Sequence, residues 1–279
     1  MMQMPTDQYV DVDGIKTRYW SVGAVGSPIL LIHGAGGSAD YWYRNIFTLA
    51  QQHQVYALDW VGSGKSDKPA ATYTYDDLTQ FVAQFMDAVS LSSANMVATS
   101  GGGIIAMKLA SRSPHRVQKL VLSGSAGLGK ELGFGMRLSA IPGIGEALNR
   151  PSRSTAKFLI RQCAYDSKAF LTDEFVDLVE RNLPLEVLQF QLRTFRTSAN
   201  FWGMKPEFLS SIRDSLPKIK APTLVLWGKQ DQITPVGGSE VAVNEIPDVK
   251  LHLFDKCGHW VYLEHTDAFN QLVLEFLRD

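Results

Sequence analysis

The sequence predicts an α/β fold in which a mostly parallel sheet is covered by helices on both faces. Short apolar segments alternate along the chain with segments whose apolar residues recur at helical spacing. Several of the apolar segments end in glycine-rich turns that carry a polar residue. Strands that alternate with helices are joined by crossovers, and such connections produce buried parallel strands. A long middle stretch lacks this alternation and predicts an inserted helical segment.

The predicted elements follow in order along the chain. Residues 10–22 alternate in polarity around Asp13-Gly14, which is typical of a hairpin. The apolar run at 28–32 predicts a buried strand, and residues 41–52 have a helix-like pattern. Further strands are expected at 54–60, 96–99 and 119–123, and helices at 75–91 and 104–112. The alternation resumes with strands at 223–227 and 250–254 and helices at 236–245 and 268–277.

The stretch without alternating strands and helices divides the chain into a core and an insertion. We expect one core built from residues 1–124 and 217–279, and a helical cap at 125–216 that is inserted after the sixth strand. The insertion is helix-like throughout and is not expected to be an independent domain. A chain of 279 residues can bury a sizeable core of this kind.

Composition excludes several classes of function. The net charge is −1 with both signs mixed, so neither nucleic acid nor an acidic surface is expected as a partner. Cys163 and Cys257 form neither a disulfide framework nor a metal-ligand spacing. His259 and His265 do not indicate a metal site, because no cluster of Cys or carboxylate ligands accompanies them. The first residues lack the basic and apolar regions of a signal peptide, so none is expected. No apolar run reaches the roughly 20 residues that a membrane-spanning helix needs. We therefore expect a cytoplasmic protein with a small-molecule substrate, without metal, cofactor or membrane partner; a homodimer is left open.

The most informative segment is the turn around Ser100. An apolar strand-like run ends at Thr99-Ser100, three glycines follow, and a helix-like pattern begins. This strand, turn and helix resemble a nucleophile elbow, in which small neighbours leave room for a strained turn with an exposed hydroxyl. Ala98 stands where that pattern usually has its first glycine, and Gly102 occupies the second position. The alternative is a glycine-rich turn that binds a phosphate or nothing.

A serine needs a base and an orienting acid, and the chain supplies both downstream. Asp231 follows the strand at 223–227, and His259 follows the strand at 250–254. The order Ser100, Asp231, His259, each placed after a strand, predicts a catalytic triad. Asp255 is the competing acid, but it lies only four residues before His259 on the same loop, where it is expected to bond the local turn.

A second glycine-rich loop, which begins at His33, follows the strand at 28–32. We expect the backbone N–H groups of Ala35 and Gly101 to form the oxyanion hole. His33 is interpreted as a structural residue that holds this loop. The Gly64-Lys65-Ser66 motif is not a phosphate-binding loop, because Asp59 stands where such a loop needs a glycine. Asp59 is expected to bond turn amides instead.

Together these motifs resemble those of the α/β-hydrolase superfamily over the whole chain. Within it, residues 257–270 and 227–231 are most similar to the meta-cleavage-product C–C hydrolases. The resemblance implies an α/β-hydrolase fold with an inserted cap. It also makes Trp260, which matches the tryptophan after the catalytic histidine of that family, a candidate for substrate contact.

The chain departs from that family at three positions. Thr99 replaces the asparagine that precedes the serine, Tyr41 aligns with an asparagine after the oxyanion loop, and Asn45 lies close by. A cap arginine that holds the substrate's carboxylate aligns with Val179, with Arg181 nearby. We take Thr99, Tyr41 and Arg181 as candidate substrate-binding residues.

Because those carboxylate-binding residues differ, we expect a serine carboxylesterase that acts on small to medium neutral esters through an acyl-enzyme. The alternative is a C–C hydrolase of 2-hydroxy-6-oxo-dienoate products, and the third reading is a small-molecule sensor on the same scaffold. Dehalogenases and epoxide hydrolases of this fold are disfavoured because they need an aspartate at the elbow. Apolar cap residues that could line the pocket are Phe195, Phe201, Trp202 and Met204.

Overall fold

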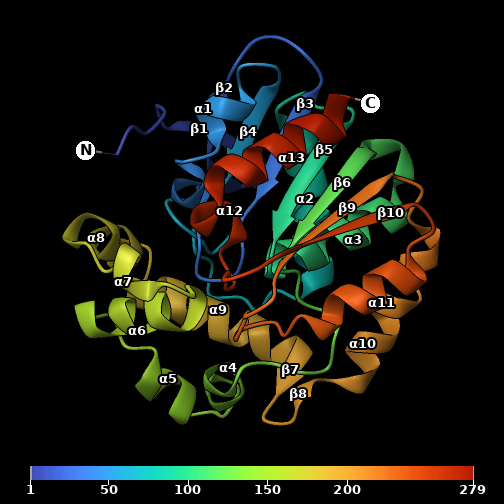
Figure 1. Ribbon diagram of the computed structural model, residues 1–279. Coiled ribbons are helices and arrows are strands. Elements are labelled where there is room, and N and C mark those ends of the chain that lie inside the picture. The colour runs from blue at the N-terminus through green and yellow to red at the C-terminus, as the bar shows by residue number, and fades with distance from the viewer. Residues whose placement is uncertain (1, 279) are drawn as a thin grey trace.

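The computed structural model describes residues 2–278 and has the predicted α/β fold (Figure 1). One eight-stranded sheet has the order β1-β2-β4-β3-β5-β6-β9-β10. β1 and β2 form the predicted hairpin, β2 pairs antiparallel with β4, and all the other neighbours are parallel. The strands are β1 (Gln8–Val12), β2 (Ile15–Val22), β3 (Pro28–Ile32), β4 (Gln54–Leu58), β5 (Ala94–Thr99), β6 (Val117–Ser123), β9 (Thr223–Gly228) and β10 (Val249–Phe254).

Helices cover both faces of the sheet, because side chains of the buried strands alternate between two apolar clusters. Leu30 and Ile32 of β3 face the cluster that includes α2 (Tyr75–Ala88), α3 (Gly101–Arg112) and α11 (Gly237–Glu245). Ile29 and Leu31 face the opposite cluster. That second face is covered by α1 (Ile46–Leu49), α12 (Val261–Glu264) and α13 (Thr266–Arg278).

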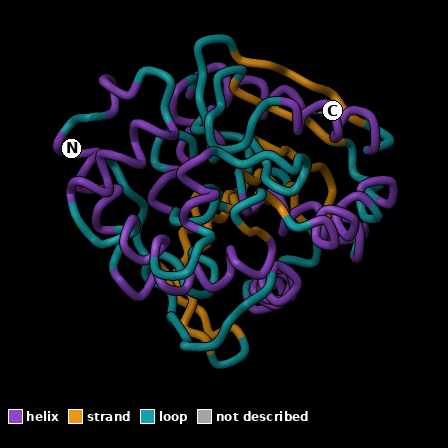
Figure 2. Tube along the Cα trace, turned by 90° about the horizontal axis from the view of Figure 1, so that it is seen from below, coloured by secondary structure: helices purple, strands orange, loops and turns teal. Residues whose placement is uncertain are grey.

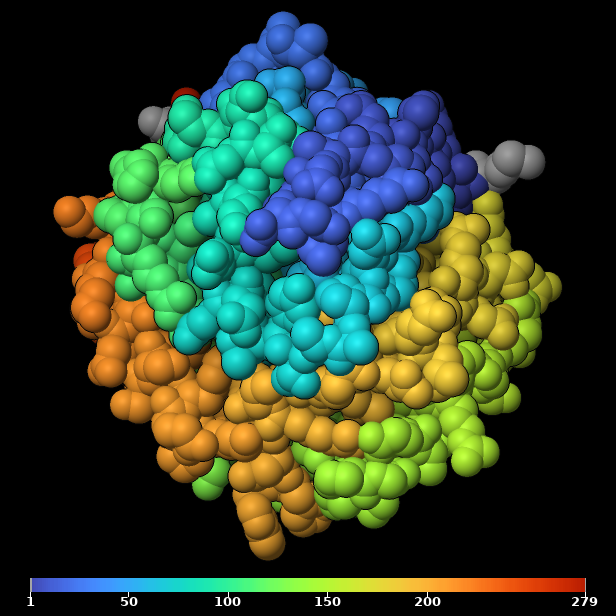
Figure 3. All heavy atoms as spheres, turned by 180° about the vertical axis from the view of Figure 1, so that it is seen from behind, coloured from blue at the N-terminus to red at the C-terminus, as the bar shows by residue number. Residues whose placement is uncertain are grey.

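Residues 125–216, which we call the cap segment, lie together at one end of the sheet (Figure 1). Seen from below, helices lie around the strands (Figure 2). Seen from behind, the residues of the cap segment pack against the core as one continuous body of atoms (Figure 3). The segment contains α4 (Phe134–Ser139), α5 (Ile144–Leu148), α6 (Arg153–Cys163), α7 (Ser167–Phe170), α8 (Asp173–Arg181), α9 (Leu185–Ser198), β7 (Ala199–Asn200), β8 (Gly203–Met204) and α10 (Pro206–Arg213). Short 3-10 turns are η1 (Ala39–Trp42), η2 (Pro114–Arg116) and η3 (Leu216–Lys218).

Two predictions about secondary structure need correction. The single helix expected at 41–52 is divided into η1 and α1, because Asn45 between them turns its amide inward to donate to the Tyr262 carbonyl and to Asn270. The cap segment is not helical throughout, since β7 and β8 form a hairpin in which Gly203 has a φ of +111°. A positive φ of this size favours glycine, and Gly203 lies in the hairpin that follows the end of α9 at Ser198.

Local sequence signals explain where α2 begins. Thr74 accepts a hydrogen bond from the Asp77 N–H, and the Asp77 carboxylate accepts one from the Thr74 N–H. This reciprocal capping satisfies two donors that the first helical turn would otherwise leave unpaired. None of the helices within residues 2–278 combines the length and the apolar character that crossing a membrane requires.

Candidate active site

Ser100 occupies the turn between β5 and α3. Its φ of 52° and ψ of −123° are a strained combination for a residue with a side chain, and such strain concentrates at functional sites. The Ser100 N–H donates to the carbonyl of Ser123 at the end of the neighbouring strand, over 3.1 Å. A Cβ on Gly102 would stand 2.4 Å from the carbonyl oxygen of His33. The tight turn therefore depends on the small residue that the elbow pattern requires at position 102.

His259 and Asp231 lie together beyond the ends of β10 and β9. Nδ1 of the buried His259 is 2.8 Å from Oδ2 of the buried Asp231. The Asp231 carboxylate also accepts the N–H groups of Ile233 and Thr234, at 2.8 and 2.9 Å, and the Thr234 hydroxyl at 2.9 Å. These donors fix the carboxylate and offset the cost of burying its charge. With Nδ1 donating to Asp231, Nε2 of His259 is left as an acceptor.

The competing acid, Asp255, lies elsewhere. It is exposed, accepts a hydrogen bond from the Gln230 amide at 3.3 Å, and has the Lys229 ammonium 3.9 Å from its Oδ1. Its pKa is lowered by the hydrogen bond from Gln230 and by the charge of Lys229. The structure thus places Asp231, and not Asp255, against the imidazole.

The glycine-rich loop after β3 packs directly on Ser100. A Cβ on Gly34 would be 2.7 Å from the Cβ of Ser100, so no side chain fits there. The amide nitrogen of Ala35 is 3.5 Å from the point that a Cβ on Gly101 would occupy, which brings the two predicted oxyanion donors to the same region. Within residues 2–278 the Ala35 N–H has no hydrogen-bond partner. A donor left unpaired beside a strained serine is what binding of a developing oxyanion requires.

His33 and Asp59 hold the surrounding turns. The imidazole of His33 is buried, has Nδ1 2.7 Å from the Gly34 carbonyl oxygen, and has a pKa lowered to about 4 by burial. Asp59 accepts the N–H groups of Ala39 and Lys65, each at 2.7 Å, and pairs with the buried Arg18 guanidinium at 3.2 Å. Burial raises the pKa of Asp59, although Arg18 opposes that shift. Neither residue lines the cavity described next.

A cavity of about 150 Å³ separates the end of the sheet from the cap segment. Core residues that line it include Tyr41, Thr99, Ser100, His259, Trp260 and Tyr262. Apolar cap residues that line it include Leu159, Leu188, Leu192 and Phe195, and uncharged polar ones are Ser139, Asn149 and Gln191. Three of the four predicted substrate-binding residues, Thr99, Tyr41 and Trp260, therefore face the cavity together with Ser100.

Arg181, the fourth predicted residue, lies outside the lining. Its side chain is 56% exposed, and its Nε is 3.8 Å from Oδ2 of Asp40. This contact holds Arg181 at the outer side of η1. Val179, which aligns with the family's cap arginine, is buried among apolar residues. The structure thus brings neither position to the cavity.

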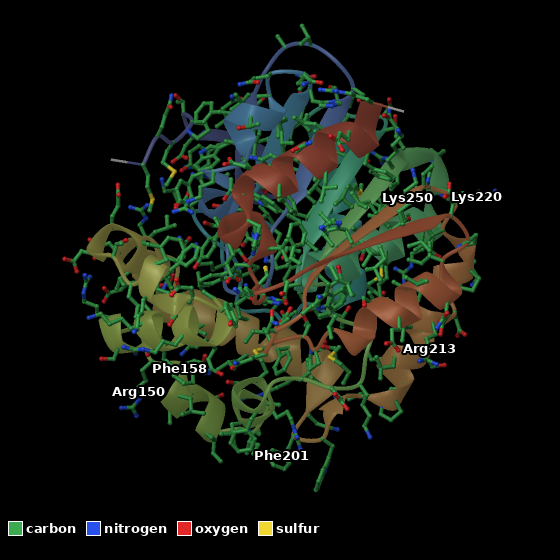
Figure 4. All side chains as sticks on the ribbon, viewed as in Figure 1. Arg150, Phe158, Phe201, Arg213, Lys220 and Lys250 are labelled. Carbon is green, nitrogen blue, oxygen red and sulfur yellow. The ribbon has the colours of Figure 1, made fainter. Side chains whose placement is uncertain are left out.

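Only one of the four cap residues that were predicted to line the pocket does so. Phe195 lines the cavity, whereas Phe201, Trp202 and Met204 do not. Phe201 lies in the turn of the β7–β8 hairpin, at the outer end of the cap segment (Figure 4). Trp202 beside it is 73% exposed. The hairpin, which the sequence did not predict, directs these side chains away from Ser100.

One imidazole, that of His259, lines the cavity. Among its lining residues, all of which lie in the described part of the chain, there is no Lys, Arg, Asp or Glu. The Thr99 side chain is almost fully buried, and its Oγ1 has no hydrogen-bond partner within residues 2–278. Over the same residues, no group of three or more His, Cys, Asp or Glu is arranged to hold a metal ion.

Sequence reasoning missed two features of this site. Thr234 was not singled out, although its place three residues after Asp231 is a common spacing for a side chain that bonds a local carboxylate. The carbonyl oxygen of Cys163 accepts the N–H of His259 at 2.6 Å. No sequence signal could have indicated that contact, because it joins a cap residue to the core through main-chain atoms.

The fold and this arrangement agree with the comparison to known families. A family model for the alpha/beta hydrolase fold matches residues 27–140 and 177–266, so the chain belongs to that family and is a hydrolase. The stretch between the two matched ranges, residues 141–176, lies within the cap segment.

Its relatives narrow the class. The chain is 32% identical to a 2-hydroxy-6-oxononadienedioate/2-hydroxy-6-oxononatrienedioate hydrolase of Comamonas testosteroni, over 90% of this chain and 88% of that protein. It is 33% identical to a 2-hydroxy-6-oxo-6-phenylhexa-2,4-dienoate hydrolase of Burkholderia cepacia, with the same coverage of both. A solved meta-cleavage product hydrolase of Pseudomonas fluorescens matches with 30% identity and a TM-score of 0.82 over 97% of each chain.

These relatives confirm the resemblance to the meta-cleavage-product C–C hydrolases. They contradict the expected carboxylesterase, because the relatives at 30–33% identity are named for dienoate substrates. The expectation relied on the missing asparagine and arginine. Departures at individual binding positions were weaker indicators of reaction type than similarity along the whole chain.

Proposed function

We propose that this protein is a serine-dependent C–C hydrolase that cleaves 2-hydroxy-6-oxo-dienoates, the products of aromatic ring cleavage. The main support is the similarity to hydrolases of such substrates over about nine tenths of the chain. The geometry adds that a strained Ser100 and His259, which is paired with Asp231, border one cavity.

In the proposed first step, the Ser100 Oγ attacks the C6 carbonyl carbon while Nε2 of His259 takes the hydroxyl proton. Asp231 keeps the imidazole in the required tautomer and stabilises its charged form. The Ala35 and Gly101 N–H groups bind the oxygen that becomes negative. Of the groups used in this step, Ser100, His259 and Ala35 line the cavity, and Asp231 contacts the imidazole of His259.

Breaking a C–C bond requires a place for the electron pair that leaves. Ketonisation moves the proton of the 2-hydroxy group to C5 and gives a conjugated 2-keto acid. When the oxyanion at C6 collapses, the pair from the C5–C6 bond moves into that system as a dienolate. His259 returns the serine proton to this dienolate, which leaves with carbons C1 to C5, and the C6 end remains as an acyl group on Ser100. Water then attacks this acyl-enzyme with His259 as the base, which releases a carboxylic acid.

The acid end of the substrate would meet hydroxyl groups and not a guanidinium. Thr99 lines the cavity and carries a buried hydroxyl without a partner in the described residues, and the buried Tyr41, which carries a phenol, lines the cavity as well. Trp260, whose ring centroid is 5.9 Å from that of Tyr41, adds a flat apolar wall. The cap side is lined mostly by apolar residues, so we propose that the group on C6 is uncharged.

The test is a comparison of substrates in the wild type and in Ser100→Ala. We expect 2-hydroxy-6-oxo-6-phenylhexa-2,4-dienoate to have a higher kcat/KM than a short p-nitrophenyl ester. Ser100→Ala should lose several orders of magnitude of turnover with both. Ester cleavage without dienoate cleavage in the wild type would refute the proposal.

A further inference from the structure

Glu264 lies where the cap segment meets the loop that carries His259. It is the last residue of α12, the single helical turn that follows this loop and lies beside the cap segment (Figure 1). Its carboxylate folds back along the turn, and Oε1 accepts the Gly258 N–H at 2.9 Å. The residue directly before His259 is therefore bonded to this side chain.

The same carboxylate also binds the cap segment. Oε2 of Glu264 accepts the N–H of Tyr165, just beyond α6, at 2.7 Å. Two residues earlier, the Cys163 carbonyl accepts the N–H of His259 itself, at 2.6 Å. Two hydrogen bonds thus join residues 163–165 of the cap to the core, one to the backbone of His259 and one to the side chain of Glu264.

Gly258 allows these parts to approach so closely. A Cβ at this position would stand 2.4 Å from the Cys163 carbonyl oxygen, 2.9 Å from the Tyr165 nitrogen and 3.1 Å from Oε1 of Glu264. Three groups thus converge on a residue that has no side chain. A small displacement of any of them is transmitted to the next residue, His259, because close-packed groups cannot shift independently.

The partial burial of the Glu264 carboxylate is unfavourable for its charged form. Glu264 is half-buried, burial raises its pKa, and no Lys or Arg of residues 2–278 forms an ion pair with it. Its charge is offset mainly by the backbone donors already named. Such donors are strong partners for a carboxylate, and they orient the chain that bears them.

We propose that Glu264 is a positioning residue that sets the orientation of His259 and the seating of the cap segment together. One carboxylate would then link closure of the cavity to alignment of the base. This inference rests on the proposed serine mechanism, because it assigns Glu264 an effect on how His259 activates Ser100.

The experiment compares Glu264→Ala and Glu264→Gln with the wild type. The matched control is Glu275→Gln, which changes an exposed acid on α13 whose carboxylate accepts a hydrogen bond from the Gln271 amide. Three quantities are measured: the rate at which an organophosphonate labels Ser100, kcat and KM for the phenyl dienoate, and the Tm. The labelling rate reports on activation of the serine without requiring C–C cleavage.

We expect Glu264→Ala to lower the labelling rate and kcat at least tenfold while KM changes less than threefold. Glu264→Gln keeps one acceptor oxygen and should show a smaller loss, and it remains informative if Glu264→Ala does not fold. Glu275→Gln should match the wild type. A lower Tm with an unchanged labelling rate per folded molecule would overturn the proposal and leave Glu264 a purely structural residue. A wild type that is not labelled at Ser100 would instead refute the serine mechanism.

Discussion

The hydroxyl of Thr234 lies 2.9 Å from Oδ2 of Asp231, the same oxygen that faces Nδ1 of His259. Thr234 Oγ1 is also 3.0 Å from the carbonyl oxygen of Gly124, beyond the end of β6. One side chain therefore connects the acid to the strand end next to Ser100. The orientation of the Asp231 carboxylate is fixed by its own loop and does not depend on the cap segment.

This arrangement predicts how two acid variants will differ. Asp231→Asn should lower turnover by about a thousandfold or more, because the amide no longer stabilises the required His259 tautomer and its charged form. Asp255→Asn should change turnover less than threefold, since Asp255 bonds only exposed neighbours. Steady-state kinetics of the two variants, with circular dichroism as a check on folding, measures the difference. The reverse ranking would show that Asp231 is not the acid.

The sequence predicted the elements that carry the triad because each of them is marked locally. A buried strand followed by a turn with one polar residue can be recognised at Ser100, Asp231 and His259 alike. The strand order could not be predicted in the same way, because pairing such as β3 between β4 and β5 joins distant segments. The cavity wall was equally hidden, since Leu159, Leu192 and Phe195 come together only through packing of the cap helices.

Thr99 should bind the acid end of a dienoate through its unpartnered hydroxyl. Thr99→Val keeps the shape of the side chain but removes the donor, so kcat/KM for the phenyl dienoate should fall about tenfold. A p-nitrophenyl ester lacks the acid end, and its cleavage should change less than twofold. Ser123→Ala is the control, because Ser123 pairs in register with Thr99 and also has an unpartnered hydroxyl, but does not line the cavity. Equal losses for both substrates would indicate a general disturbance of the elbow.

His33 should make the protein less stable in mild acid. Burial lowers its pKa to about 4 in the folded state, whereas an unfolded chain has a histidine pKa of about 6.5. The unfolded state therefore binds more protons between these values, and stability is lost as the pH falls from about 6.5 towards 4. At pH 5 the loss from this group should be about 2 kcal/mol relative to pH 7.5.

Urea unfolding at pH 7.5 and pH 5 measures this difference. His33→Asn should remove the part of the pH dependence that comes from the buried imidazole, whereas His115→Asn, which changes an exposed histidine, should leave the pH dependence as it is. An unchanged pH dependence in His33→Asn would mean that other groups account for the loss.

The charge of the cavity should decide which dienoates are cleaved. No Lys or Arg is among the lining residues, so a second carboxylate on the C6 side would be buried without a cationic partner. The phenyl dienoate should therefore have a kcat/KM at least about tenfold higher than that of 2-hydroxy-6-oxononadienedioate, because the second carboxylate of the dioate lacks one charge-assisted hydrogen bond.

Gln191→Arg would add a cation to the cap side, and it should narrow this ratio of kcat/KM values by favouring the dioate. Leu192→Met, a change of similar shape without charge, should keep the ratio of the wild type. A wild type that prefers the dioate would show that a cation from outside the lining reaches the substrate, and Arg181→Ala would then test one cap arginine that lies outside the lining.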